Sequence, residues 1–91
     1  MELEWTPAAL GDLDAAGRFI AEDNPGAAAH MAERVQLAVE YLVNHPALGR
    51  PGRLHGSREL VVSGTPLVVI YRVRLDAIQI LRVLHHARKW S

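Results

Sequence analysis

The sequence predicts an α+β fold: a short amino-terminal strand, then an antiparallel two-helix hairpin packed on an antiparallel β-meander. Residues 7–44 carry apolar side chains at helical spacing, interrupted only at Asn24-Pro25. Residues 58–84 instead hold three runs rich in Val, Ile, Leu and Tyr, separated by short turns. The chain has 91 residues, 49% hydrophobic and 22% charged. This is the composition of a folded protein, and the length suits one domain, residues 1–91.

The helical half contains two helix starts, each marked by a proline. Glu2-Leu3-Glu4-Trp5 alternates polar and apolar residues, as a short strand does. Thr6-Pro7 then supplies a hydroxyl N-cap and a proline at the first helical position, and Asn24-Pro25 repeats this before a second helix that runs to His45-Pro46. So short a break predicts that the helices pack antiparallel. The predicted buried stripes are Leu10, Leu13, Gly17 and Ile20 in the first helix, and Ala28, Met31, Val35, Ala38 and Leu42 in the second.

The carboxyl-terminal half predicts a loop and then three strands. Residues 46–56 contain two prolines and three glycines, which favours a loop. We expect strands at 58–62, 67–74 and 78–84. Both links between these strands are too short for a crossover, so the strands form an antiparallel meander.

A tight turn at Leu75-Asp76 would set the register of the last two strands. It places Tyr71 opposite Ile80 and Arg72 opposite Gln79, and residues opposite each other share a face. The apolar face that would receive the helices is Leu67, Val69, Tyr71, Val73, Ile78, Ile80 and Leu84. The other face, mixed and basic, is Val68, Ile70, Arg72, Arg74, Gln79, Leu81, Val83 and His85.

The net charge of zero hides a strong asymmetry between the two halves. Residues 1–45 hold two arginines against eight acids, whereas residues 46–91 hold seven arginines and one lysine against two acids. This distribution predicts a basic working surface that meets an acidic or anionic macromolecule. The alternative is that the two halves attract each other within the fold.

Several function classes are disfavoured by what the sequence lacks. There is no cysteine, so disulfides, cysteine zinc sites and thiol nucleophiles are excluded. No phosphate-binding loop, nucleophile elbow or metal-ligand spacing stands out, and we expect neither a metal nor a cofactor. The amino terminus does not resemble a signal peptide, and no apolar run approaches the roughly 20 residues that span a bilayer. We expect a cytoplasmic protein without a membrane partner.

The candidate binding residues are cations. Arg82 lies within an apolar run, where an unpaired charge is costly. It therefore has either an acid partner, such as Glu59 or a helix acid, or a binding role. Arg58 and Glu59 could form a local surface pair of little value. The candidate binding set is Arg50, Arg53, Arg58, Arg72, Arg74, Arg82, Arg88, Lys89 and Trp90.

The carboxyl-terminal tract supplies the candidate catalytic residues, His85, His86 and Arg88. Imidazoles can transfer protons near neutral pH, and the neighbouring cations and indole could bind phosphate or stack on a base. The alternative is a charged tail that keeps the sheet edge soluble while Trp90 packs on the domain. Adjacent strand residues point to opposite faces, so the two histidines would not share a site while the strand continues.

The order of elements and several tracts resemble the RelE/ParE toxin superfamily of bacterial type II toxin–antitoxin modules, closer to its ParE-like branch. The tracts run in the expected order over nearly the whole chain. They are Trp5-Thr6-Pro7-Ala8-Ala9, Asn24-Pro25-Gly26-Ala27-Ala28, His45-Pro46-Ala47-Leu48-Gly49-Arg50-Pro51-Gly52, Arg58-Glu59-Leu60-Val61-Val62, Pro66-Leu67-Val68-Val69-Ile70-Tyr71-Arg72-Val73 and Ile80-Leu81-Arg82-Val83-Leu84-His85.

The resemblance implies a growth-inhibiting toxin that is neutralised by a cognate antitoxin. An acidic antitoxin tail would suit the basic sheet, and DNA contact at the promoter would come mainly through the antitoxin. ParE-like members poison DNA gyrase, whereas RelE-like members cleave messenger RNA on the ribosome.

The residues favour the gyrase-directed branch, without an enzymatic activity. Where the ribonucleases carry an arginine before the Leu-Val-Tyr tract of the middle strand, this chain has Val68, which cannot stabilise an oxyanion. Their lysines before the meander are also missing, although Arg50, Arg53 and His55 could substitute. The alternatives are a ribosome-dependent endoribonuclease and a degenerate toxin that retains only antitoxin binding.

Overall fold

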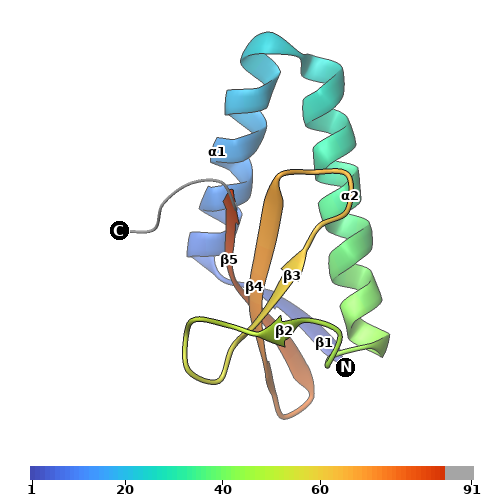
Figure 1. Cartoon of the computed structure of the whole chain (residues 1–91), viewed down its shortest axis with the longest axis vertical. Helices are drawn as coiled ribbons and strands as arrows, with labels where there is room; N and C mark the ends of the chain where they lie inside the picture. Colours follow the sequence, from blue (N-terminus) through green and yellow to red (C-terminus); the bar gives the residue numbers. More distant parts are fainter. Residues whose placement is uncertain (86–91) are drawn as a thin grey trace.

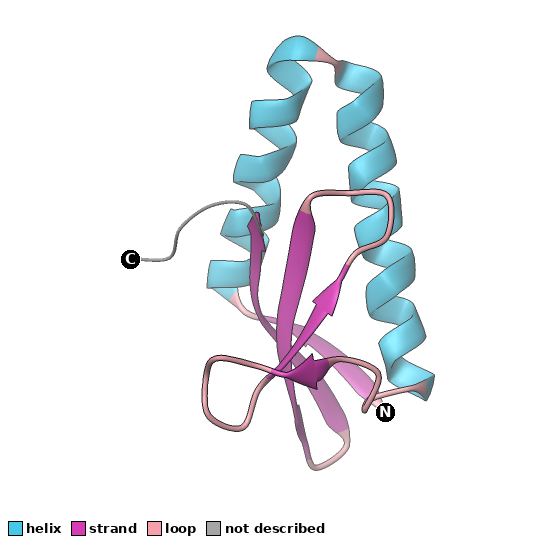
Figure 2. Ribbon diagram, in the orientation of Figure 1, coloured by secondary structure: helices cyan, strands magenta, loops and turns pink. Residues whose placement is uncertain are grey.

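The computed structural model describes residues 1–85 and shows two long helices packed on one face of a twisted sheet (Figure 1, Figure 2). The sheet has five strands in the order β1-β5-β4-β3-β2. This arrangement confirms the predicted α+β class. The elements are β1 (Glu2–Trp5), α1 (Pro7–Asp23), α2 (Pro25–Asn44), β2 (Arg50–Pro51), β3 (Arg58–Val61), β4 (Leu67–Arg74) and β5 (Ala77–His85).

The sheet is mixed and not purely antiparallel. β2 to β5 pair antiparallel, as the meander predicts, but β1 lies parallel to β5, with Leu3 opposite Ile78 and Trp5 opposite Ile80. The parallel pairing is possible because the helical hairpin lies between β1 and the other strands in the sequence. It provides the long connection that parallel strands need. The first and last strands of the chain are therefore neighbours.

Both predicted helix starts are confirmed by their caps. The Oγ1 of Thr6 accepts a hydrogen bond from the amide of Ala9 at 3.2 Å, and the Oδ1 of Asn24 accepts one from the amide of Ala27 at 3.0 Å. A proline stands at the start of each helix, where no amide donor is needed. Asn24 also ends α1, so one residue divides the hairpin.

The buried stripe of α1 differs from the predicted one. Ala9 is fully buried and Leu13 and Ile20 pack against the core, whereas Leu10 is 52% exposed. Adjacent helical residues lie about 100° apart, so a stripe through Ala9 turns Leu10 away from the sheet. The α2 stripe agrees better with the prediction: its buried residues are Met31, Val35, Val39 and Leu42.

The β4–β5 register holds near the turn and then shifts. Tyr71 pairs with Ile80 as predicted, but Ile70 pairs with Arg82, so Leu81 is the extra residue of a bulge. One extra residue reverses the alternation of faces beyond it. Val83 therefore joins the core in place of the predicted Leu84, which is only partly buried.

The two faces of β4 are less different than predicted. Val68 and Ile70, expected on a mixed and basic face, are 2% and 0% exposed. Val73, expected in the core, is 41% exposed. The face away from the helices therefore has a buried apolar centre, and the cations lie around it.

The loop predicted at 46–56 contains the short strand β2, which the prediction missed. Tyr71 holds this segment in place: its Oη donates to the carbonyl of Pro46 and accepts from the amide of Gly49, both at 2.8 Å. A Cβ on Gly49 would lie 2.7 Å from the same oxygen, so only glycine fits there. None of the helices in residues 1–85 is long and apolar enough to cross a membrane.

Candidate functional site

Six of the predicted binding arginines lie on four strands of the sheet or in the loop between β2 and β3, and most are engaged within the fold. Arg50 lies on β2, Arg58 on β3, Arg72 and Arg74 on β4, and Arg82 on β5, while Arg53 lies in the loop between β2 and β3. His85 ends β5 and is partly buried. The remaining candidates, His86, Arg88, Lys89 and Trp90, lie outside the described residues.

Arg82 has the acid partner that was one of its predicted alternatives, although 44% of its side chain is exposed. Its Nε and Nη2 donate to the two carboxylate oxygens of Asp12 at 2.7 and 2.9 Å. Asp12 also accepts from the amide of Val83 at 3.0 Å. The partner is thus a helix acid, the second of the two predicted possibilities, and Glu59 is not involved. The hydrogen bonds that Arg82 donates to Asp12 raise the pKa of its guanidinium.

Asp12 acts where the edge of β5 loses its neighbouring strand. β1 ends at Trp5, and the next residue, Thr6, donates through its Oγ1 to the carbonyls of Ile80 and Leu81 at 2.8 and 3.1 Å. The start of α1 therefore satisfies the backbone of the bulge, since backbone groups without a partner are costly when buried. The side chain of Asp12 is only 16% exposed, whereas that of Asp14 in the same helix is 62% exposed.

Glu59 is the centre of a second charged cluster. Its side chain is 4% exposed, and its carboxylate accepts from the Nε of Arg53 at 2.9 Å and from the amide of Arg53 at 3.0 Å. The Nη2 of Arg50 lies 3.7 Å away. The hydrogen bond from Arg53 lowers the pKa of Glu59, against the opposing effect of burial. The cluster fixes the loop between β2 and β3 onto β3.

Arg58 does not pair with its neighbour Glu59 as proposed from the sequence. Adjacent strand residues point to opposite faces. Its Nη1 instead donates to the carbonyl of Gly49 at 2.7 Å and to that of Ala47 at 3.4 Å. Arg58 therefore supports the segment after α2.

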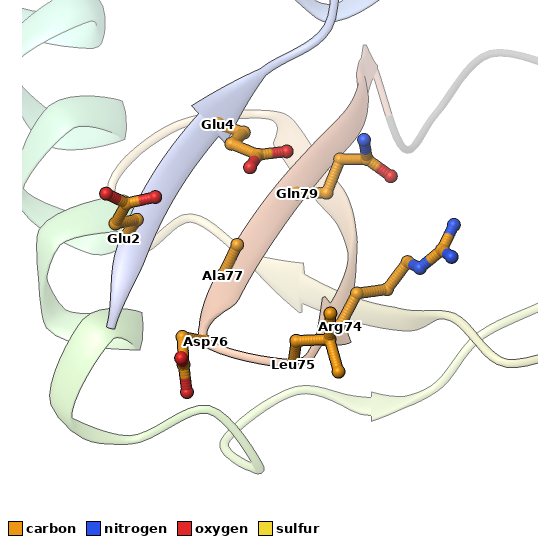
Figure 3. A pocket seen from close by; sticks show the side chains of 7 residues that line it. All are labelled: Glu2, Glu4, Arg74, Leu75, Asp76, Ala77 and Gln79. Atoms are coloured by element: carbon orange, nitrogen blue, oxygen red, sulfur yellow. The ribbon is translucent and has the colours of Figure 1, made fainter.

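The remaining two arginines of β4 lie near its end. The Nε of Arg72 donates to the Oε1 of Gln79 across the β4–β5 pair at 2.7 Å. Arg74 lines a surface depression beside the β4–β5 turn (Figure 3). The other lining residues are Glu2, Glu4, Leu75, Asp76, Ala77 and Gln79. Sequence reasoning missed this depression because the carboxylates of β1 reach it only through the parallel pairing.

The described residues show how the charged groups of the site are held. Within residues 1–85 no group of three or more histidine or acidic residues could hold a metal ion. Val68, at the position where the resemblance implies an arginine in ribonucleases, is buried. Arg53, Arg58 and Arg82 are bound to a carboxylate or to backbone carbonyls.

Known proteins resemble this chain over nearly its whole length. Residues 3–90 match the family described as "ParE toxin of type II toxin-antitoxin system, parDE". The protein Y4kP of Sinorhizobium fredii is 42% identical over 88 residues, which cover 97% of this chain and 91% of that protein. Toxin RelE2 of Caulobacter vibrioides is 38% identical over 87 residues, which cover 96% of this chain and 97% of that protein.

A solved structure shares both the fold and part of the sequence. A chain of the chromosomal ParDE TA system from P. aeruginosa superimposes with a TM-score of 0.79 and is 32% identical. The match covers 91% of this chain and 92% of that chain. The mixed sheet and the helical hairpin described above are thus also found in an experimental structure.

Proposed function

We propose that this chain, which belongs to the ParE toxin family of type II toxin–antitoxin systems, arrests bacterial growth by poisoning DNA gyrase. Membership of a toxin–antitoxin module implies a cognate antitoxin as its partner. The proposed setting is the cytoplasm, where gyrase and the antitoxin would both be met. The chain would act by binding, without chemistry of its own.

The engagement of the cations carries this proposal. A ribonuclease needs cations that are available to stabilise charge developing on phosphate. Here Arg82 is bound to Asp12, Arg53 to Glu59, and Arg58 to the carbonyls of the segment after α2. Cations held in this way support a rigid protein-binding surface more than a nuclease site.

The exposed arginines would contact the target or the antitoxin. Arg50 is the best candidate, because its side chain is 67% exposed and its contact with Glu59 is long, at 3.7 Å. An acidic antitoxin tail could pair with this cation. Contact with DNA would then come mainly through the antitoxin.

A supercoiling assay tests the proposed target. Purified chain, gyrase, ATP and relaxed plasmid should give reduced supercoiling or accumulated linear DNA at micromolar concentration. Arg50→Gln should weaken the effect, because it removes an exposed cation. Arg18→Gln is the control, since Arg18 is 80% exposed on α1, far from the sheet cations in sequence. Unchanged supercoiling at micromolar wild-type chain would count against gyrase as the target.

Ribosome-dependent cleavage of messenger RNA is the second candidate. The relative named Toxin RelE2 favours it, and so does His85, an imidazole at the end of β5 that could act as an acid or base. Toeprinting on translating ribosomes would reveal cleavage in the A site. Intact messenger at toxic amounts of the chain would exclude this candidate, and expression without growth arrest would favour a degenerate toxin.

A further inference from the structure

The turn between β4 and β5 carries a leucine in a backbone conformation that leucine seldom adopts. Leu75 has φ of 51°, and among the described residues it is the only one other than glycine with positive φ. Two-residue hairpin turns normally place Gly, Asn or Asp at such a position, because a branched side chain clashes with the backbone there. Leu75 therefore has a strained backbone conformation.

Burial of the Leu75 side chain does not offset this strain. Leu75 is 95% exposed, the highest value among the exposed large hydrophobic residues. A single exposed leucine is ordinary on a protein surface. A leucine that is both strained and fully exposed is not, since asparagine or glycine would relieve the strain and lose no packing.

The turn is also held rigidly in place. Arg74 pairs with Ala77 across it, and the amide of Glu2 donates to the carbonyl of Asp76 at 2.6 Å. The first residue of β1 therefore fixes the turn. A turn whose backbone is already ordered loses less entropy when it binds a partner, and such preorganisation favours binding.

The surroundings of Leu75 indicate the chemistry of its partner. Figure 3 shows Leu75 and Asp76 at the turn, with Glu2 and Glu4 on the neighbouring β1. Three carboxylates thus line the depression next to the leucine, against one guanidinium, that of Arg74. Like charges disfavour a nucleic-acid phosphate or an acidic peptide at this place, whereas a basic protein surface would be attracted.

We propose that Leu75 is an anchor residue, which docks into an apolar pocket with a basic rim on the protein target of this toxin. This inference rests on the proposed function only in that the target is a protein. It adds the β4–β5 turn to the residues that would contact the target, in addition to the exposed cation of Arg50.

Substitution by asparagine separates this role from a structural one. Asparagine tolerates positive φ, so Leu75→Asn should unfold at a higher denaturant concentration than the wild type. We expect the same variant to need at least about tenfold more protein for half-maximal growth arrest and for half-maximal gyrase inhibition. Leu75→Met, which keeps an apolar side chain, should retain most of the toxicity.

Two further variants test specificity and charge. Leu37→Gln removes another exposed leucine, 52% exposed on α2, and should leave growth arrest unchanged. The double variant Glu2→Gln/Glu4→Gln keeps Leu75 and should bind the target severalfold more weakly at low salt only. Equal weakening by Leu37→Gln would show that general surface hydrophobicity matters and would overturn the anchor role.

The outcomes distinguish the two proposals. Growth arrest by Leu75→Asn at the wild-type level overturns the anchor role of Leu75, regardless of the result of the gyrase assay. Growth arrest by the wild type without any effect on gyrase overturns the gyrase proposal alone, and the anchor is then judged by the growth assay. A wild-type chain that never arrests growth overturns both.

Discussion

Glu59 shows how one buried carboxylate can organise a loop. Its side chain accepts hydrogen bonds from both the guanidinium and the amide of Arg53, and it is 4% exposed. Burial alone would raise its pKa, yet the hydrogen bond from Arg53 outweighs burial and lowers the pKa below its ordinary value of 4.5. The folded state therefore stabilises the ionised form of the Glu59 side chain.

This lowered pKa predicts a pH dependence of stability. Below about pH 4.5 the unfolded chain takes up a proton at this position before the folded chain does, so the free energy of unfolding falls with pH. The contribution is complete above that pH and is lost as the pH falls through the native pKa. We expect Glu59→Gln to be less stable at pH 7 by about 1–3 kcal/mol and to lose less stability between pH 5 and 3.

Urea unfolding followed by circular dichroism at several pH values measures this effect. Glu33→Gln is the control, because Glu33 is exposed on α2. This variant should lose as much stability between pH 5 and 3 as the wild type. Parallel pH profiles for the wild type and Glu59→Gln would contradict the assignment.

α1 contributes to the sheet through its polar residues as well as its apolar stripe. Thr6 and Asp12 satisfy backbone groups of β5 beyond the end of β1, and Asp12 also binds Arg82 through both carboxylate oxygens. The beginning of α1 thus covers the part of the β5 edge that β1 leaves without a neighbouring strand. The helix position and the bulge at Leu81 are coupled, because the same contacts hold both.

Asp12→Asn should measure this coupling. It weakens the ion pair and the hydrogen bond to Val83, and we expect a loss of about 1–3 kcal/mol in the free energy of unfolding. Asp14→Asn is a matched control, since Asp14 pairs with Arg18 on the solvated face, where both side chains are more than 60% exposed. That variant should change stability by less than about 0.5 kcal/mol.

Chemical denaturation of the two variants side by side provides the measurement. Equal losses would mean that the pairing of Asp12 with Arg82 contributes no more than a surface ion pair.

Viewed as a whole, the molecule is centred on β4. This strand pairs on both edges, and residues 67–71 are buried on both faces. At one edge of the sheet the first described strand, β1, lies parallel to β5, the last described strand. The acidic half and the basic half are interleaved in one fold, as the Asp12–Arg82 pair illustrates. The alternative that the halves attract each other is therefore supported, and it is compatible with a basic surface for a partner.

Hydrogen exchange should follow this hierarchy. Amides of β4 and of the adjoining part of β5 should exchange slowest, with protection close to the global free energy of unfolding, because they open only when the core opens. The edge strand β2 has a single amide hydrogen, that of Arg50, because Pro51 has none, and this hydrogen should exchange fastest among those of the strands. Exchange measured by NMR would contradict this picture if the helix amides outlasted those of β4.

The sequence by itself determined the features that depend on neighbouring residues. The caps at Thr6 and Asn24, the order of the elements and the pairing of Tyr71 with Ile80 were all predictable, because caps and tight turns are set within a few residues. The resemblance to a toxin superfamily also came from ordered local tracts. The candidate site was predicted as a set of cations, and a helix acid was a predicted alternative partner of Arg82, but its identity as Asp12 was not predicted.

Only the tertiary structure decided the features that depend on distant residues. Asp12 and Arg82 are 70 positions apart, and no local pattern pairs them. The bulge at Leu81 exchanged Leu84 for Val83 in the core, and the parallel position of β1 brought Glu2 beside the β4–β5 turn. The strain at Leu75 is likewise a property of the folded hairpin. Interactions between neighbouring residues determine where helices and turns form. Contacts between distant elements determine which charged side chains are paired within the fold and which remain available to a partner.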